Sequence, residues 1–103
     1  MPPALKPLEI PVRHATGPAV AVTAADGLIL VDASAGPVTC TLPAAAGVTG
    51  LYVRVKKIDP SGNPVTIGTS GGELIGGLAA WPSITLRWNN LGFVSDGTDW
   101  YVL

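Results

Sequence analysis

The chain has 103 residues, of which 48% are hydrophobic and 13% charged, with a formal net charge of −1. This length predicts one domain, and the composition excludes a disordered chain. The charge gives no electrostatic reason for a nucleic-acid partner, and no apolar run reaches the roughly 18 residues of a membrane span, so we expect neither nucleic acid nor membrane as a partner. Because charged residues make up about 25% of a typical domain, we expect part of the apolar surface to be buried against other subunits.

The N-terminal segment is rich in proline. Residues 1–18 hold half of the ten prolines, and each proline fixes φ and removes a backbone donor. We therefore expect residues 1–18 to form an extended arm outside the sheets and residues 19–103 to form a β-domain. The segment lacks a positively charged start followed by an apolar run, so we do not expect a signal peptide.

Short segments of alternating apolar and polar residues follow the arm. The predicted strands are residues 20–23, 28–32, 38–42, 51–58, 64–67, 83–88, 91–95 and 99–103. Turn residues separate them: Asp26-Gly27 and Asp96-Gly97 tolerate positive φ, and Asn89-Asn90 has the length of a two-residue hairpin loop. Strands at this spacing predict an all-β fold, a small antiparallel sandwich or barrel-like domain.

Alternation also predicts which side chains face the core. Cys40 lies at an inward position of its strand, and Ile84, Leu86 and Trp88 are expected to share one core-facing side. In the last strand, Trp100 and Val102 lie on one face, and Tyr101 and Leu103 lie on the other. Both faces are apolar, which favours burial of one face in the chain's own core and of the other against a neighbouring subunit.

Few residues are candidates for catalysis. His14 is the single histidine and lies in the arm, where we interpret it as a surface or interface residue, while Cys40 is interpreted as an inert buried thiol. The glycine-rich stretch 68–77 lacks the lysine of a phosphate-binding loop. Asp96 and Asp99 fit a tight turn, and binding of a cation such as Ca²⁺ stays open as an alternative. We expect no catalytic site, no resident metal and no cofactor.

Several short motifs occur in a characteristic order. They are Asp32, "VTCTLPAA" at 38–45, Gly50, "VKKID" at 55–59, "GNPVTI" at 62–67, the loop from Gly72 to Gly77 and "SDGTDWYVL" at 95–103. In this order they resemble a β-structured module that recurs in bacteriophage tail fibres, tailspikes and small virion surface proteins. The resemblance covers residues 26–103.

The resemblance implies a non-enzymatic virion structural protein that forms a homotrimer about a shared axis. It also implies a location on the virion surface after synthesis in the host bacterial cytoplasm, which the single cysteine also fits. Because fibre proteins are generally long, the short sequence favours a capsid decoration (cement) protein or a short head spike, bound to the major capsid protein or another virion protein. The arm residues expected to contact the capsid are Pro2, Pro3, Leu5, Pro7, Leu8, Ile10, Pro11 and Val12. The residues expected at the subunit interface are Tyr101 and Leu103.

A tail-fibre or receptor-binding tip is the alternative function. In that case aromatic rings would contact a host surface glycan. Trp81 precedes Pro82 in a predicted loop and is the favoured contact, whereas Trp88 and Trp100 are expected in the core. The sequence leaves the choice between a head and a tail location open.

Overall fold

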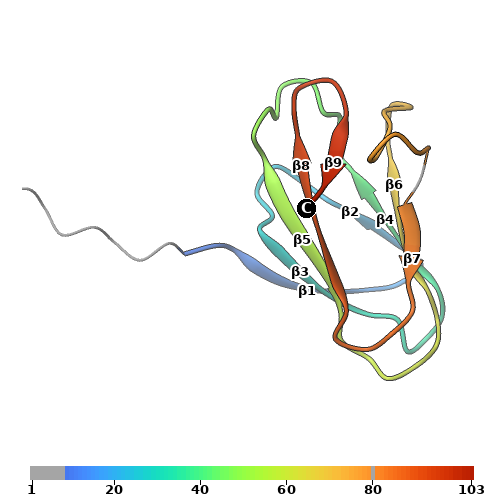
Figure 1. Ribbon diagram of the computed structural model, residues 1–103. Coiled ribbons are helices and arrows are strands. Elements are labelled where there is room, and N and C mark those ends of the chain that lie inside the picture. Colours follow the sequence, from blue (N-terminus) through green and yellow to red (C-terminus); the bar gives the residue numbers. More distant parts are fainter. Residues whose placement is uncertain (1–8, 80) are drawn as a thin grey trace, which may run out of the picture.

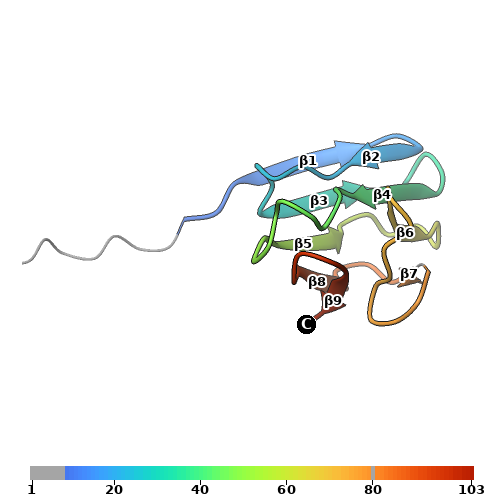
Figure 2. The same cartoon turned by 90° about the horizontal axis from the view of Figure 1, so that it is seen from above.

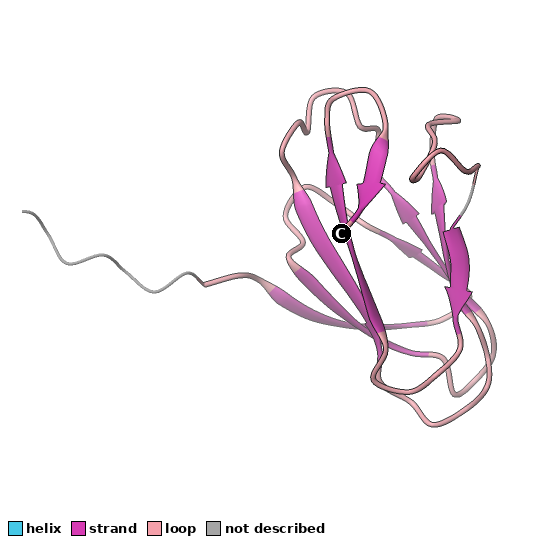
Figure 3. Cartoon of the chain, in the orientation of Figure 1, coloured by secondary structure: helices cyan, strands magenta, loops and turns pink. Residues whose placement is uncertain are grey.

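The computed structural model describes residues 9–79 and 81–103, and for residues 81 and 82 it describes the backbone alone. Over this part the chain is all-β and has nine strands. The strands are β1 (Val12–Thr16), β2 (Ala19–Ala21), β3 (Leu28–Asp32), β4 (Val38–Leu42), β5 (Tyr52–Lys57), β6 (Val65–Thr69), β7 (Trp81–Ile84), β8 (Asn90–Ser95) and β9 (Trp100–Val102). Loops join them (Figure 3). Among these residues there is no helix with the length and hydrophobicity to cross a membrane.

The strands form two sheets that enclose a common core (Figure 1). The larger sheet has the order β1-β3-β5-β8-β9, and the smaller sheet has the order β2-β4-β6-β7. The all-β prediction is therefore confirmed. Within the described part of the chain, each sheet contains both parallel and antiparallel neighbours.

The first six strands alternate between the two sheets. β1, β3 and β5 pair in parallel in one sheet, and β2, β4 and β6 pair in parallel in the other. The chain thus winds through three stacked coils of two strands each (Figure 2). β7, β8 and β9 then add in antiparallel orientation. The expected antiparallel sandwich was wrong on this point: each connection crosses to the opposite sheet, so a strand returns in the direction of the strand two before it.

The core between the sheets is mainly aliphatic. Ile29 and Val31 of β3 and Val53 and Val55 of β5 point inward and have no exposed surface. The smaller sheet contributes Val20, Val38, Cys40, Leu42, Val65, Ile67 and Ile84. β-Branched side chains pack well on such a pleated surface. Because full burial of one large apolar side chain stabilises a fold by about 1.5–3 kcal/mol, this core holds the sheets together.

The last strand closes the larger sheet, as the sequence predicts. β9 pairs antiparallel with β8, with Trp100 opposite Ser95 and Tyr101 opposite Val94. Trp100 is fully buried, whereas Tyr101 faces outward and is 47% exposed. The prediction that Trp100 faces the core is confirmed. The outer face of the strand, which carries Tyr101, is exposed to solvent on the single chain.

The predicted strand at 83–88 and the predicted hairpin at Asn89-Asn90 were both wrong. β7 ends at Ile84 and pairs with β6, while β8 pairs with β5 in the other sheet. Residues 85–89 therefore connect the two sheets. Ile84 is buried, but Leu86 and Trp88 are 65% and 54% exposed. The alternating pattern predicted that Leu86 and Trp88 face the core, but β7 ends at Ile84, so the alternation does not continue to them.

Part of the proline-rich segment belongs to the larger sheet. β1 pairs in parallel with β3, from Val12 opposite Leu28 to Thr16 opposite Asp32. This corrects the expectation that residues up to 18 lie outside the sheets. The stretch from 12 to 17 contains no proline, so its backbone donors are available for a ladder. Residues 1–8 lie outside the described part of the chain.

The first coil is fixed to the second by one charged pair and one close backbone approach. The Arg13 side chain donates to both carboxylate oxygens of Asp26, over 3.0 and 2.9 Å, and to the carbonyl of Ala21 over 3.0 Å. A Cβ on Gly27 would lie 2.9 Å from the carbonyl oxygen of Pro11, so this contact requires glycine. Arg13 occupies an inward position of an edge strand, where a charge hinders addition of another strand.

Candidate functional site

An exposed row of side chains crosses the outer face of the larger sheet. The register aligns Tyr52 of β5, Val94 of β8 and Tyr101 of β9 on neighbouring strands. Tyr52 on the central strand is 41% exposed, and Leu103, directly after the edge strand β9, is 68% exposed. The N–H of Leu103 donates to the carbonyl of Gly92 over 2.9 Å. The two predicted interface residues, Tyr101 and Leu103, therefore lie beside further apolar surface that the sequence did not single out.

Local contacts hold the Tyr52 ring against the sheet. A Cβ on Gly92 would lie 2.6 Å from the Tyr52 hydroxyl, so this glycine provides the space that the ring occupies. Arg54 donates to the Tyr52 hydroxyl and to the side-chain carbonyl of Asn90. Its guanidinium carbon lies 5.6 Å from the centre of the Tyr52 ring. A ring ordered in advance loses little entropy when a partner covers it.

The loop between β8 and β9 is a tight turn. Asp96 Oδ1 accepts hydrogen bonds from the backbone N–H groups of Thr98 and Asp99, over 2.9 and 2.8 Å. Asp99 Oδ1 accepts one from the N–H of Leu74 over 2.9 Å. The N–H groups of Asp99 and Thr98 lower the pKa of Asp96, and the hydrogen bond with Asp96 raises the pKa of Tyr101. Among the described residues there is no group of three or more His, Cys, Asp or Glu placed to hold a metal ion.

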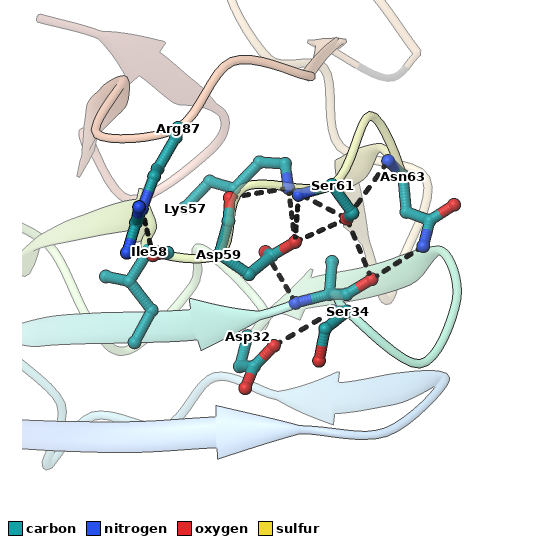
Figure 4. A network of polar contacts seen from close by, with 9 residues as sticks. Asp32, Ser34, Lys57, Ile58, Asp59, Ser61, Asn63 and Arg87 are labelled. Carbon is teal, nitrogen blue, oxygen red and sulfur yellow. Dashed lines mark hydrogen bonds and ion pairs between the residues drawn. The ribbon is translucent and has the colours of Figure 1, made fainter.

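A buried ion pair lies at the end of β5 (Figure 4). Lys57 Nζ has no exposed surface and donates to Asp59 Oδ2 over 2.8 Å. Asp59 is itself 5% exposed and also accepts hydrogen bonds from the N–H of Ala33 over 2.7 Å and of Ser61 over 3.0 Å. Asn63 Nδ2 donates to the Ala33 carbonyl over 2.8 Å. These contacts join the second and third coils.

The carboxylate of Asp59 is committed to this structural network. Burial by itself raises its pKa, but the hydrogen bonds from Lys57 and Ser61 outweigh burial and hold the pKa of Asp59 well below its usual range. An anionic carboxylate with several bonded donors is a poor proton acceptor, so the pair is suited to stabilising the corner. The sequence contained a signal for this pair: Lys57 continues the inward positions of Val53 and Val55 and is followed two residues later by an acid.

The remaining predicted residues are spread over the molecule. His14 is exposed on the outer face of β1. Cys40 is fully buried, as predicted, and burial raises the pKa of its thiol to about 11. Ile10 and Val12 of the expected docking arm are 51% and 57% exposed, and Pro11 is also exposed. The other docking residues, Pro2, Pro3, Leu5, Pro7 and Leu8, and the side chain of Trp81 lie outside the described part of the chain.

The glycine-rich stretch closes the end of the core near β9. Ile75 is fully buried and forms bridges with Leu78 and Trp100. The N–H of Gly76 donates to the carbonyl of Trp100 over 2.9 Å. This stretch therefore acts as packing against the last strand, a role that its glycine content did not indicate.

Neither the family models nor the curated proteins that were searched match this chain. The functional assignment therefore depends on the resemblance of the motifs and on the surface described above.

Proposed function

We propose that this chain is a non-enzymatic structural protein of a bacteriophage virion. It assembles as a homotrimer and decorates the capsid as a cement protein or short head spike. The ordered motifs from Asp32 to the closing "SDGTDWYVL" support the phage assignment by resemblance. The fold supports a structural role, because the buried Lys57, Asp59 and Ser95 side chains join strands and turns.

One observation supports the trimer: the row formed by the exposed Tyr52 and Tyr101 with the half-buried Val94 between them, and the exposed Leu103 at its edge. Aromatic side chains are enriched in the buried centres of protein interfaces, where they contribute much of the binding energy. A threefold arrangement lets this face of each protomer contact a neighbour around the axis. The low charge content of the chain is then explained by the area that assembly buries.

The N-terminal segment is the proposed contact with the capsid. Its described residues Ile10 and Val12 present exposed apolar side chains next to the edge of the larger sheet. Arg13 and Asp26 satisfy each other on the inner side of this edge. The segment can therefore present its apolar side chains to the major capsid protein while β1 stays in the sheet.

A tail-fibre or receptor-binding tip is the second candidate. The exposed side chain of Trp88 favours it, because an accessible indole ring is a good surface for a sugar. The assignment of this role to Trp81 stays a prediction.

Labelled protein mixed with purified particles of the parent phage tests the proposal. We expect it to sediment with the particles, and cryo-electron microscopy should place it on the head in groups of three. Double substitution of Ile10 and Val12 by serine should lower the occupancy and leave the trimer intact. Binding at the tail alone would favour the second candidate, and no binding to any particle would contradict a virion role.

A further inference from the structure

A groove opens on the outer face of the larger sheet, at the end of β3. Two hollows of about 200 and 110 Å³ form it, and Thr16 and Asp32 line both of them, so we call it the Asp32 groove. Much of the remaining lining is apolar and consists of Ala15, Pro18, Ala35, Pro37 and Ile58. Asp32 is the one acid among the lining residues. The groove therefore surrounds a carboxylate with apolar walls.

The carboxylate of Asp32 has no cation beside it on the single chain. Asp32 is half-buried, and its Oδ1 accepts a hydrogen bond from the N–H of Ser34 over 2.9 Å. Hydrogen bonds from Ser34 lower the pKa of Asp32, so the carboxylate is charged at neutral pH. Within residues 9–79 and 81–103 there are two ion pairs, and neither includes Asp32. A half-buried anion of this kind favours a partner that supplies a cation.

The connection between β7 and β8 presents a cation and an aromatic ring together. The N–H of Asn89 donates to the carbonyl of Leu86 over 3.2 Å, which closes a turn with Arg87 and Trp88 at its tip. Both side chains at the tip are exposed, and the guanidinium carbon of Arg87 lies 4.3 Å from the centre of the Trp88 ring. A separate groove of about 260 Å³ does not include the tip and is lined by residues 83–86 and 89–91.

Three hydrogen bonds hold this Arg87–Trp88 tip in place. Arg87 Nε donates to the carbonyl of Ile58 over 3.0 Å, and the N–H of Trp88 donates to the carbonyl of Lys57 over 2.7 Å. Lys56 Nζ donates to the carbonyl of Trp88 over 2.9 Å. Trp88 has a φ of 72°, a conformation that persists only where surrounding contacts impose it. A partner can therefore cover the tip without the entropy cost of ordering it.

The groove and the tip lie at the same level of the larger sheet. Asp32 is opposite Thr16, and the N–H of Ile58 donates to the carbonyl of Val31, which brings Ile58 beside Asp32. Arg87 reaches the same residue, Ile58, from the other direction (Figure 4). Because the sheet order is β1-β3-β5-β8-β9, the groove lies on the β3 side of Ile58 and the tip lies on the β8 side.

We propose that the Arg87–Trp88 tip of one chain inserts into the Asp32 groove of a second copy of this chain. The guanidinium of Arg87 pairs with the carboxylate of Asp32, and the apolar walls of the groove cover the Trp88 ring. This inference rests on the proposed homotrimer and specifies a contact between its neighbours. Rotation about an axis along the strands keeps every residue at its level, so the β8 side of each chain meets the β3 side of the next.

A second copy of this chain is the partner that satisfies both features at once. An acidic partner protein would cover the tip but leave Asp32 without a cation. A basic partner protein would pair with Asp32 but leave the Trp88 ring exposed. In a closed ring of three copies, every groove receives a tip and every tip enters a groove.

Cross-linking between two variants that each carry one added cysteine tests the proposal. Thr16→Cys places a thiol in the groove, and Leu86→Cys places one beside the tip, while the native Cys40 is fully buried. The two variants, one with a mass tag, are mixed, allowed to exchange subunits and treated with a short bismaleimide. We expect a covalent pair of one tagged and one untagged chain. Thr39→Cys on the smaller sheet, mixed with Leu86→Cys, is the control and should give no such pair.

Substitutions test the charge and the shape of the contact separately. Arg87→Asp brings two carboxylates together and should raise the dissociation constant of the trimer at least about tenfold. Adding Asp32→Arg to the same chain restores opposite charges at every contact, so most of the lost affinity should return. Thr16→Trp fills the groove at an exposed strand position and leaves the tip unchanged, so it should also weaken assembly. Melting temperatures show whether each variant is folded.

Light scattering on the same samples distinguishes failure of this contact from failure of the homotrimer. If the wild-type protein is a trimer, three results would each overturn the contact and leave the homotrimer standing. They are absence of the mixed cross-link, equal cross-linking to the Thr39→Cys control, and an unchanged dissociation constant in folded Thr16→Trp. A wild-type protein that stays monomeric would overturn both proposals.

Discussion

Trp100 joins the last strand to the rest of the molecule at several points. Its side chain is fully buried, and its Nε1–H donates to the carbonyl of Pro43 over 3.1 Å. Its backbone N–H donates to the carbonyl of Leu74, and its carbonyl accepts from the N–H of Gly76, both over 2.9 Å. Trp100 thus connects β9 to two segments that are distant in sequence, at Pro43 and at residues 74–76.

Trp100→Ala should lower the free energy of unfolding by about 3–5 kcal/mol, the usual cost of truncating a large buried aromatic side chain. Loss of the bond to Pro43 adds to the cost, because that carbonyl loses its donor. Urea denaturation followed by circular dichroism measures the change. Leu86→Ala is the control: its side chain is 65% exposed, so the change should stay within about 0.5 kcal/mol. A Trp100→Ala protein as stable as wild type would show that the last strand is not part of the core.

The pair of Lys57 and Asp59 should show strong coupling in a double-mutant cycle. Lys57→Met leaves a buried carboxylate without its cation and should cost about 3–5 kcal/mol. In the double variant Lys57→Met/Asp59→Asn, no charge is buried and the side-chain oxygen still accepts from Ala33, so part of the stability should return. The coupling energy from urea denaturation should reach about 1 kcal/mol or more. If the losses in unfolding free energy of the two single variants simply add in the double variant, Lys57 and Asp59 do not stabilise the fold as a pair.

The same pair predicts a dependence of stability on pH. The pKa of Asp59 is lower in the folded chain than in the unfolded chain, whose value is about 3.9. Its contribution is therefore complete above about pH 4 and is lost as the pH falls toward the folded pKa. Unfolding free energies measured from neutral to acidic pH should decline less steeply in Lys57→Met/Asp59→Asn than in wild type. Equal slopes would show that Asp59 does not contribute to the acid response.

At the scale of elements, β1 should be an integral strand. It contributes a five-residue parallel ladder with β3 and the pair between Arg13 and Asp26. A chain that begins at Gly17 should therefore unfold at a lower temperature than a chain that begins at Glu9, as measured by calorimetry. Because both chains lack residues 1–8, the difference in melting temperature reports the contribution of residues 9–16, which include β1. Equal melting temperatures would mean that β1 does not contribute to the fold.

Strand positions were largely predictable, but strand pairing was not. The segments at 28–32 and 38–42 were predicted with the observed boundaries, since their alternation is regular and their ends carry turn residues. Alternation reports only which side chains share a face, so it cannot tell a connection that reverses within a sheet from one that crosses to the opposite sheet. The parallel pairing of the first six strands could therefore be seen only in the structure.

The candidate surfaces were predictable to different degrees. Tyr101 and Leu103 were predicted to face a neighbouring chain because an apolar last strand needs two partners, and both side chains are exposed on the single chain. Trp88 was missed because alternation assigned it to the core, and its conformation depends on a contact with the distant carbonyl of Lys57. The groove lined by residues 83–86 and 89–91 exists only because β7 and β8 belong to different sheets, which local patterns do not report.

At the scale of the whole molecule, stability and assembly should be separable. Tyr101 faces away from the core, so Tyr101→Ala should leave the protomer folded and raise the dissociation constant of the proposed trimer. Truncation of an interface aromatic commonly costs more than about 1 kcal/mol per site, and a trimer contains three copies of the site. Dilution experiments by analytical ultracentrifugation measure the shift. Unchanged dissociation in a folded variant would place the interface elsewhere.

We propose that the exposed face of the larger sheet holds three chains together in a homotrimer. Size-exclusion chromatography with multi-angle light scattering tests it most directly, because it reports mass independently of shape. We expect a single species of three times the 10.4 kDa chain mass at micromolar concentration, and a shift toward the chain mass when Tyr101→Ala is combined with removal of Leu103. A wild-type protein that elutes at 10.4 kDa across the accessible concentrations would contradict it.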